Sequence, residues 1–297
     1  MQGVVVALPN DEELAGELGK KGTTNSIFFF NKKIRGIAIT VLFPSNVEEK
    51  FYAVAQSILL SNVVVLSSKN INVLFGESLI ACSLLGKKVL ITSDNDTSNL
   101  VRGLGIEYKV VEKERLEEEI LSSAPSAEKD SETRIDLDHA FPVTGVGDVV
   151  LGIVTKGSVA KHASLFHNSG KQVTVRSIQM QDEDVESAEK GARVGLALKG
   201  ISYKDVEKGD VLASRQIKPR QKIVCSISFS SLAKEIPSFP FRCFFVHNFS
   251  YANCTVNKQG ESFEINFEKG IPIENGDSFL LVRSELPRIF AKGTVIG

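Results

Sequence analysis

Short apolar runs alternate with amphipathic helical segments over the first 121 residues of the chain. The run 4–8 is short and wholly apolar, which is typical of a buried strand. Asn10 follows it, with Glu13 three residues later, and this pair predicts the N-cap and the capping-box partner of a short helix that ends near Gly19. The local pattern therefore predicts a strand followed directly by a helix.

Two β-rich runs, 26–30 and 36–43, come next and are separated by the short polar segment 31–33. Such a connection predicts an antiparallel hairpin. The segment 44–49 then precedes the clearest helical pattern of the chain, in which apolar residues recur at i, i+4, i+7 and i+8. These residues are Val47, Phe51, Val54, Ala55, Ile58 and Leu59.

The same alternation continues to residue 121. Further strands are expected at 63–66, 89–92 and 106–111, and further helices at 77–85, 97–104 and 112–121. This order of elements predicts a mostly parallel sheet with one antiparallel strand and with helices on both faces.

The character of the chain changes after residue 121. The segment 122–134 is small, polar and without periodicity, as linkers are. Short β-rich runs separated by Gly, Asp and Asn turns follow and predict β-barrels or sandwiches. The expected strands are 147–156, 171–179, 193–198, 223–229, 242–247, 252–256, 262–267, 278–283 and 288–295. We expect an α/β domain at 1–121, a linker at 122–134, and two all-β domains at 135–216 and 217–297, divided by the stretch 214–220.

Composition narrows the possible partners. The 297 residues include 35 Lys and Arg and 36 Asp and Glu, a net charge of −1, which argues against a uniformly basic nucleic-acid coat protein. No stretch approaches the ~18 consecutive apolar residues of a membrane span, and the first ten residues lack the pattern of a cleaved leader. We therefore expect a cytoplasmic protein without membrane or DNA partners.

Cysteine and histidine spacing gives no metal or disulfide signal. Cys82, Cys225, Cys243 and Cys254 form no CxxC pair, and the four histidines form no HxxxH pair. Each cysteine lies in an apolar neighbourhood, which favours a small buried thiol. We expect no cofactor and no metal.

The most specific motifs lie in the first all-β domain. Residues 138–157 read DHAFPVTGVGDVVLGIVTKG, and 171–180 read KQVTVRSIQM; AEKGARVGLALKGI stands at 188–201 and KGDVLA at 208–213. Together they resemble the second domain of translational GTPases, in the archaeal elongation factor 1-alpha and selenocysteine-specific elongation factor branch of the elongation factor Tu family. Segments 271–283 and 288–296 are similar to the closing strands of that family's third domain.

The resemblance covers residues 135–297 by sequence and the first domain only through its order of elements. It implies the elongation factor Tu layout: an α/β P-loop-GTPase-like domain followed by two all-β barrels, the first of them a translation-protein barrel.

The first domain lacks the family's phosphate loop. A translational GTPase needs GxxxxGK[ST] after its first strand, because the backbone N–H groups of that loop, its Lys and its Ser/Thr hold the phosphates and Mg²⁺. Residues 7–16 read ALPNDEELAG instead, with three acidic side chains and no lysine. The segment GKKGTT at 19–24 has suitable residue types but follows the first helix, so we interpret it as an exposed turn.

The other two nucleotide motifs are also missing. LFPS stands at 42–45, where the family has DxxG, and SDND stands at 93–96, where the guanine-reading NKxD is expected; only Asp96 remains of it. Phosphoryl transfer depends on positioning and charge neutralisation. A chain that lacks all three motifs therefore lacks the groups that would catalyse GTP hydrolysis. The sequence predicts a pseudo-GTPase without catalytic, nucleotide-binding or metal-binding residues.

The resemblance also places candidate RNA contacts on the barrels. Gln179 stands where the family has an acidic residue that packs on the terminal adenine of tRNA, and Arg193 where a polar residue lines the same pocket. A glutamine can lie against a base, and an arginine can pair with a phosphate or a carboxylate. The alternative is that both lie on a solvated barrel rim. Lys218, Arg220 and Lys222, at the start of the third domain, would meet an RNA backbone.

Three functional hypotheses follow. The first is an elongation factor-like protein that neither binds nor hydrolyses GTP, is not an enzyme, and uses its barrels to bind tRNA, the ribosome or another translation factor. The second is an active GTP-binding elongation factor that delivers aminoacyl-tRNA, which requires Lys20 or Lys21 at a phosphate and Asp96 at guanine. The third is an adaptor whose barrels bind a protein partner.

Overall fold

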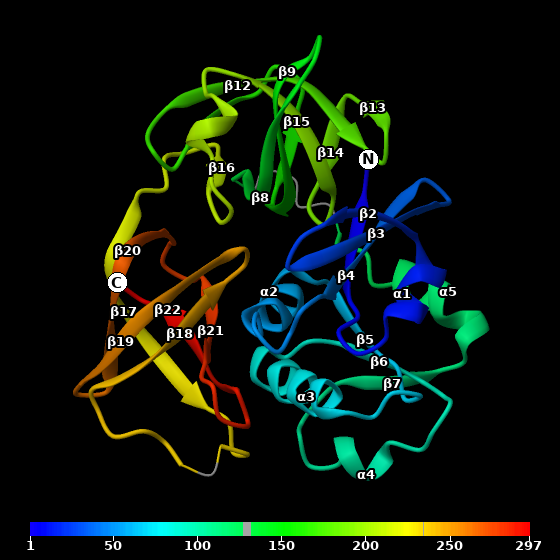
Figure 1. The fold of residues 1–297 in the computed structure, drawn as a ribbon, viewed down its shortest axis with the longest axis vertical. Coiled ribbons are helices and arrows are strands. Elements are labelled where there is room, and N and C mark those ends of the chain that lie inside the picture. Colours follow the sequence, from blue (N-terminus) through cyan, green and yellow to red (C-terminus); the bar gives the residue numbers. More distant parts are fainter. Residues whose placement is uncertain (127–131, 234) are drawn as a thin grey trace.

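The first domain is a seven-stranded sheet with helices on both faces (Figure 1). The computed structural model describes residues 1–126, 132–233 and 235–297. The strands are β1 (Gly3–Ala7), β2 (Lys20–Thr24), β3 (Ile27–Ile34), β4 (Ile37–Pro44), β5 (Val63–Leu66), β6 (Val89–Thr92) and β7 (Tyr108–Val111), in the order β2-β3-β4-β1-β5-β6-β7. Strands β4, β1, β5, β6 and β7 pair in parallel, whereas β3 runs antiparallel to both of its neighbours. The predicted mostly parallel sheet with one antiparallel strand is confirmed.

The helices divide between the two faces of this sheet. They are α1 (Glu12–Leu18), α2 (Tyr52–Leu60), α3 (Val73–Leu85), α4 (Ser98–Val101), the 3₁₀ turn η1 (Lys113–Arg115) and α5 (Leu116–Leu121). Helices α1 and α5 share one apolar core with β1, β4 and β5. Helices α2 and α3 pack on the other face, in a core that also includes barrel residues Val246, Leu280 and Ile289.

Several local predictions in this domain are wrong. Asp11 caps α1 in place of Asn10, because the Asn10 amide is engaged by the neighbouring loop described below. The segment 19–24 contains strand β2 and is not a turn; it pairs with the otherwise open edge of β3. Helix α3 begins at Val73, one turn before residue 77, because Asn72 caps it by accepting a hydrogen bond from Phe75 N.

The ends of the other helices also differ from the pattern. Helix α2 begins only at Tyr52 after a turn that starts at Asn46, and the segment 97–104 yields a helix of four residues, α4. The segment 112–121 divides into η1 and α5. Of the expected linker 122–134, residues 127–131 lie outside the described residues, and Arg134 is already the first residue of β8.

Two closed β-barrels follow the sheet domain. The first contains β8 (Arg134–Val143), β9 (Gly147–Lys156), β11 (Ser164–His167), β12 (Gln172–Met180), β15 (Arg193–Lys199) and β16 (Val211–Ala213). Its other elements are β13 (Glu183–Val185), which pairs with β12, a two-stranded ribbon of β10 (Ser158–Ala160) and β14 (Ser187–Glu189), and the 3₁₀ turn η2 (Tyr203–Asp205). The second contains β17 (Pro219–Phe229), β18 (Phe241–His247), β19 (Ser250–Gln259), β20 (Ser262–Pro272), β21 (Ser278–Val282) and β22 (Ile289–Val295). An α/β domain followed by two barrels is therefore the observed fold, as predicted.

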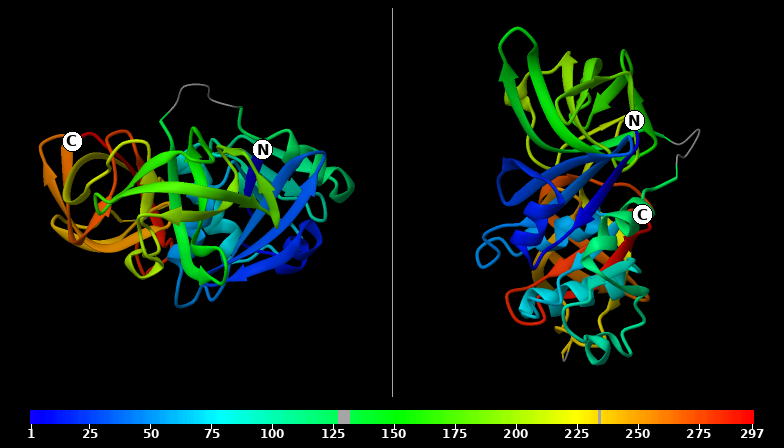
Figure 2. Two further views of the ribbon diagram at one scale, coloured as in Figure 1. Left: turned by 90° about the horizontal axis from the view of Figure 1, so that it is seen from above. Right: turned by 90° about the vertical axis from the view of Figure 1, so that its right-hand side faces the viewer.

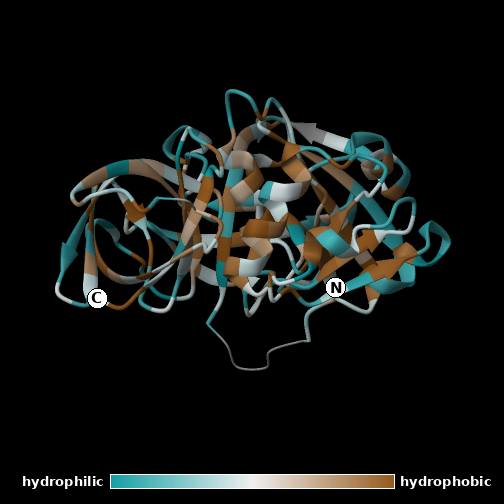
Figure 3. Ribbon diagram, turned by 90° about the horizontal axis from the view of Figure 1, so that it is seen from below, coloured by the Kyte–Doolittle hydropathy of each residue, from teal (hydrophilic) through white to brown (hydrophobic). Residues whose placement is uncertain are grey.

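The three domains lie at the corners of a triangle, and each contacts both others (Figure 1; Figure 2). Figure 3 shows hydrophobic residues gathered in the inner strands and helices and hydrophilic residues in the outer loops. None of the described helices is long and apolar enough to cross a membrane.

Close backbone contact joins the sheet domain to the first barrel. A Cβ on Gly3 would lie 2.6 Å from Ala192 Cα, so the start of β1 packs directly on the turn before β15. The Gln181 amide, at the end of β12, donates to the carbonyls of Lys32 and Ile39 at 3.1 Å each. These contacts hold the barrel against β1 and the β3–β4 hairpin.

Polar and aromatic contacts join the sheet domain to the second barrel. The buried Glu77 carboxylate on α3 accepts hydrogen bonds from Arg288 N at 2.8 Å and Ile289 N at 3.1 Å. Burial raises the pKa of Glu77, although both N–H groups oppose that shift. Tyr52 on α2 stacks on Tyr251 with ring centroids 3.9 Å apart.

Gly293 of β22 has no room for a side chain. A Cβ there would lie 2.0 Å from the ring of buried Phe279, across the β21–β22 pair. We expect Gly293→Ala to destabilise the protein by about 3 kcal/mol through overpacking, measured as a shift in the urea unfolding transition. Gly76→Ala is the matched control: its Cβ would meet nothing within 4 Å on helix α3, so the change should stabilise by about 0.5–1 kcal/mol. An unchanged transition for Gly293→Ala would contradict this packing.

Candidate functional site

Helix α1 begins at the carboxyl end of β1, where a helix N-terminus offers free N–H groups and favours an anion. Here the chain supplies the anion itself. Asp11 has extended backbone, is buried, and its carboxylate accepts a hydrogen bond from Leu14 N at 3.0 Å. The charge that a bound phosphate would bring to this helix end is already provided by a side chain.

Asn10 ties this loop to the end of β5. Its buried amide donates to the carbonyl of Ser67 at 2.8 Å and to that of Asn70 at 2.9 Å, and its Oδ1 accepts from Ser67 N at 3.1 Å. The amide thus makes three hydrogen bonds, and the segment between β1 and α1 is fixed against the next loop.

The loop after β6 is fixed in a similar way. Ser68 Oγ donates to the Thr92 carbonyl at 2.6 Å, and the Asn95 amide donates to the Ser68 carbonyl at 2.8 Å. Asp96, the predicted remnant of the guanine-reading motif, accepts a hydrogen bond from Ser98 N at 2.9 Å at the start of α4. That backbone hydrogen bond lowers the pKa of Asp96. In this structure the Asp96 carboxylate therefore stabilises a local turn.

Little space remains at this edge of the sheet. The cavity bounded by the three loops has a volume of about 40 Å³ and is lined by the carboxylates of Asp11, Glu13, Glu17 and Asp94. Its two lysines are already paired, Lys69 with Glu13 at 3.2 Å and Lys113 with Glu17 at 2.6 Å. Pockets for small ligands are roughly 300 Å³ or larger. In this conformation the cavity is well below that size, and carboxylates make up most of its charged lining.

The lysines that an active GTPase would need lie on the edge strand β2. Lys21 Nζ pairs with Glu12 at 2.8 Å and lies 3.7 Å from the centroid of the Phe28 ring. Lys20 pairs in the ladder with Asn31. The described contacts of Lys21 hold it on the surface of the sheet domain.

Arg193 lies in the interface between the sheet domain and the first barrel. Its guanidinium makes a bidentate ion pair with Asp138 at 2.9 and 3.0 Å and stacks on the Phe29 ring at 3.4 Å. Only 9% of the Arg193 side chain is exposed, so it does not lie on a solvated rim. Its proposed contact with an RNA phosphate would require this interface to open.

Gln179 remains on the surface. It lies on β12 opposite Gly195, and its amide donates to Asp184 at 3.1 Å. Gln179 and Arg193 therefore come from strands β12 and β15, which pair, but only Gln179 is accessible to a partner.

The three basic candidates lie at the start of the second barrel. Lys218 is exposed just before β17. Arg220 and Lys222 are on β17, where Arg220 donates to Asn275 at 2.8 Å and Lys222 pairs with Glu264. Of the two partners only Glu264 is charged, so it offsets Lys222, whereas Asn275 leaves the charge of Arg220 unchanged. The RNA-contact role of the three residues stays a prediction.

A cleft of about 410 Å³ lies where all three domains meet, on the side of α2 where that helix begins. It is lined by Lys50 and Tyr52 of the sheet domain, Lys208 of the first barrel, and Tyr251 and Lys269 of the second. Lys208 donates to Ser26 Oγ at 2.8 Å and to Gln56 Oε1 at 3.0 Å, and burial lowers its pKa to about 8. Sequence reasoning missed this cleft because its residues are far apart in the chain.

The cysteines include one spatial pair that spacing did not reveal. Cys243 on β18 lies opposite Cys254 on β19, with their Sγ atoms 3.6 Å apart, and both are buried free thiols. Among the described residues, no group of three or more His, Cys, Asp and Glu side chains is arranged to hold a metal ion.

Part of this chain is similar in sequence to known elongation factors. The family model for elongation factor Tu domain 2 matches residues 147–213. Elongation factor 1-alpha of Methanothermobacter thermautotrophicus is 35% identical over 89 residues, which are 30% of this chain and 22% of that protein. The selenocysteine-specific elongation factor of Methanocaldococcus jannaschii is 35% identical over 104 residues, which are 34% of this chain and 22% of that protein. Over residues 147–213 the chain is therefore similar to the second domain of translational GTPases of the elongation factor Tu type.

Two further relatives match over nearly the whole chain. A protein of Methanocaldococcus jannaschii named "Uncharacterized protein MJ0325" is 26% identical over 294 residues, 95% of this chain and 96% of that protein. The crystal structure of translation elongation factor SelB from Methanococcus maripaludis with the GTP analogue GppNHp has a TM-score of 0.80 and 20% identity, covering 100% of this chain and 79% of that one. This translational GTPase relative therefore shares the whole three-domain fold, whereas the sequence matches to the named elongation factors span about a fifth of each.

The Asp11 cap makes a measurable contribution to the sheet domain. We expect Asp11→Ala to destabilise the protein by about 1 kcal/mol, because Leu14 N loses its acceptor. Asp11→Asn is the matched control and should be nearly neutral, since asparagine caps a helix about as well. Urea unfolding of the three proteins distinguishes them. Equal stability of the Ala variant and the unsubstituted protein would contradict the cap.

Proposed function

We propose that this chain is a translation-factor-like binding protein that neither binds nor hydrolyses GTP. Its barrels bind tRNA, the ribosome or another translation factor, and it works in the cytoplasm without a cofactor. It is a pseudo-GTPase and not an enzyme.

One observation carries the loss of nucleotide binding: the Asp11 carboxylate occupies the N-terminus of α1. A phosphate there would face this carboxylate and those of Glu13, Glu17 and Asp94 around a cavity of about 40 Å³. Opening the site would also break the three hydrogen bonds of the buried Asn10 amide. A buried polar group left without partners costs about 1–3 kcal/mol, before any repulsion between like charges is counted.

The domain interfaces support a fixed arrangement. Arg193, Gln181 and Glu77 each hold two domains together through contacts within the chain. A ligand shifts an equilibrium only when it contacts two states differently. No DxxG Gly stands at residues 42–45 to sense a phosphate, so we propose that GTP does not switch this arrangement.

We propose that RNA contacts the three-domain cleft and the surface of the barrels. Lys50, Lys208 and Lys269 line the cleft, and lysines provide the sequence-independent part of affinity for a phosphate backbone. Glu207, which pairs with Lys269, and Asp210 line it as well, so an RNA phosphate would compete with Glu207 for Lys269. Exposed Gln179 and the basic residues Lys218, Arg220 and Lys222 extend the proposed surface along the barrels.

Two alternatives compete with this proposal. An active GTP-binding elongation factor would need the sheet edge to rearrange so that Lys20 or Lys21 reaches a phosphate and Asp96 reaches guanine. A protein-partner adaptor would use the barrel surfaces without RNA. The family's named relatives include elongation factors, which favours the RNA-binding form over the adaptor.

Filter binding of labelled tRNA tests the proposal. Aminoacylated and deacylated tRNA are each titrated with the protein at two salt concentrations, with and without GTP and Mg²⁺. We expect binding that ignores GTP and weakens as salt rises. Lys50→Gln and Lys269→Gln should each weaken it by roughly threefold to tenfold, whereas Lys109→Gln, on the outer edge strand β7, should leave it unchanged.

Each other outcome contradicts part of the proposal. GTP-dependent binding would establish a working nucleotide site and overturn the pseudo-GTPase. The absence of binding under every condition would favour the protein-partner adaptor.

A further inference from the structure

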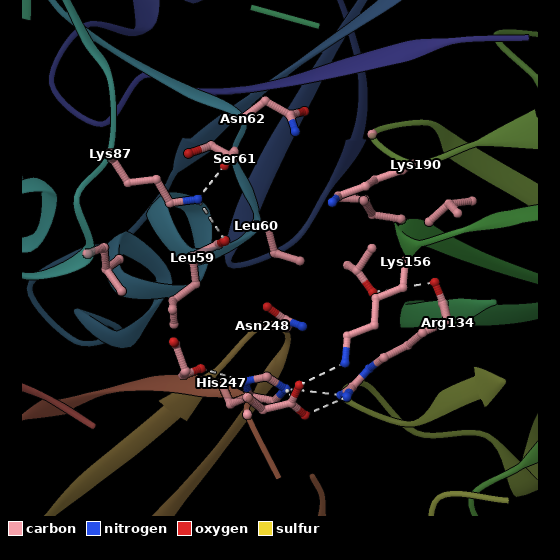
Figure 4. Close-up of a pocket in the computed structure, with 18 residues that line it drawn as sticks. Leu59, Leu60, Ser61, Asn62, Lys87, Arg134, Lys156, Lys190, His247 and Asn248 are labelled. Atoms are coloured by element: carbon pink, nitrogen blue, oxygen red, sulfur yellow. Dashed lines mark hydrogen bonds and ion pairs between the residues drawn. The ribbon is translucent and has the colours of Figure 1, made fainter. Parts of the chain in front are cut away.

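The β18–β19 hairpin of the second barrel reaches both other domains. At its turn, the Phe249 carbonyl accepts a hydrogen bond from the Gln56 amide of α2 at 2.7 Å. The last residue of β18, His247, lies beside Arg134 of the first barrel, with its Nε2 3.0 Å from the guanidinium (Figure 4). The contacts between the second barrel and the other two domains therefore depend on where this hairpin is held.

Two cysteines face each other across the same hairpin. Cys243 of β18 and Cys254 of β19 are directly opposite in the antiparallel register, and their Sγ atoms are 3.6 Å apart. Directly opposite residues in such a pair have Cα atoms about 4.5–5.5 Å apart, and disulfides span Cα distances of about 4.4–6.8 Å. Side-chain rotation can therefore bring the two sulfurs to bonding distance without separating the strands.

The other two cysteines lack such a partner. Cys225 lies in the same barrel core, but Phe263 and Val295 are the residues opposite it on the neighbouring strands. Cys82 is buried in helix α3 of the sheet domain. Of the four cysteines, all of which the structure describes, only Cys243 and Cys254 form a directly opposite pair.

The surroundings of this pair restrict which oxidant can react with it. Cys243 is 8% exposed and Cys254 is 4% exposed, and both belong to a core that also contains Phe241 and Phe245. Such burial excludes bulky reagents and admits only small solutes. The hydrogen bond to the Cys243 thiol, together with burial, raises the pKa of Cys254. Because the thiolate is the reactive form, we expect oxidation of the pair to be slow at neutral pH.

We propose that Cys243 and Cys254 form a reversible disulfide when the protein meets a small peroxide, and that this bond fixes the hairpin that joins the domains. The Cys243 thiolate, the more exposed of the two, attacks a peroxide oxygen. An S–O bond forms, the O–O bond breaks, and the hydroxide that leaves becomes water with the thiol proton. The Cys254 thiol then attacks the sulfenic sulfur, so that the S–S bond forms and a second water leaves. The peroxide accepts the two electrons that the thiols lose.

The disulfide would close a loop of residues 244–253, which contains His247 and Phe249. A crosslink of this kind removes conformational freedom from the unfolded chain and stabilises the folded one. We expect oxidation to raise the unfolding temperature by about 5 °C. This site does not rest on the proposed pseudo-GTPase function.

Peptide mass spectrometry of the full chain tests the disulfide. The protein is treated with hydrogen peroxide at pH 7 and pH 8, its free thiols are blocked with iodoacetamide in urea, and trypsin is added. Arg242 and Lys258 flank both cysteines, and no Lys or Arg lies between them, so residues 243–258 are released as one peptide. We expect this peptide to lack two hydrogens and to carry no blocking group, and dithiothreitol should restore both thiols. The reaction should be about tenfold faster at pH 8.

Matched variants separate this pair from the other thiols. Cys225→Ala removes a buried thiol of the same barrel and should leave the crosslink and its rise in unfolding temperature in place. Cys254→Ala should abolish both. If Cys254→Ala does not fold, the peptide masses of the unsubstituted protein and of Cys225→Ala decide alone.

Three results would overturn the proposal. In the first, both cysteines of peptide 243–258 stay open to iodoacetamide after peroxide treatment. In the second, the peroxide carries them to sulfinic or sulfonic acid, which dithiothreitol does not reverse. In the third, the disulfide forms but the unfolding temperature does not rise, which would show that the bond does not fix the hairpin.

Discussion

The buried guanidinium of Arg134 joins the two barrels, and the arrangement of the domains depends on it. It donates to Asp136 within its own barrel and to Asp277 and the Pro272 carbonyl of the next. His247 completes the cluster: its Nδ1 donates to the Ser278 carbonyl and its Nε2 accepts from Arg134. Burial and the Arg134 charge lower the pKa of His247, which keeps the ring neutral for this role. Removing one partner of such a buried network costs several kcal/mol, because the others remain without compensation.

The sheet domain is held against this pair of barrels by contacts of a different kind. Apolar residues of α2 and α3 share a core with the second barrel. In the same interface, the Glu77 carboxylate on α3 accepts hydrogen bonds from two backbone N–H groups of that barrel. On the other side, Arg193 stacks on Phe29 while it pairs with Asp138. Each of these contacts lies within the chain, so the three-domain arrangement of this structure is held by the chain's own residues.

The sequence predicts most of this fold because its strongest signals are local. The apolar runs of β1, β5 and β6 and the spacing along α2 depend on neighbours in the chain. Strands of three residues, such as β10 and β13, are too short to show a period, and β2 forms only because the edge of β3 is available. The predicted N-cap at Asn10 was wrong, because the Asn10 side-chain amide donates hydrogen bonds to the carbonyls of Ser67 and Asn70, which are far from it in the sequence. The pairing of Arg193 with Phe29, the three-domain cleft and the Cys243–Cys254 contact are also non-local, and no spacing rule reveals them.

Small-angle X-ray scattering of the nucleotide-free protein tests the fixed three-domain arrangement most directly. Profiles are recorded alone and with excess GTP and Mg²⁺, and are compared with the profile calculated from this structure. We expect both profiles to agree with the structure and with each other. A nucleotide-free profile that is more extended and becomes compact on adding GTP would contradict this expectation, because a nucleotide would then be needed to bring the domains together.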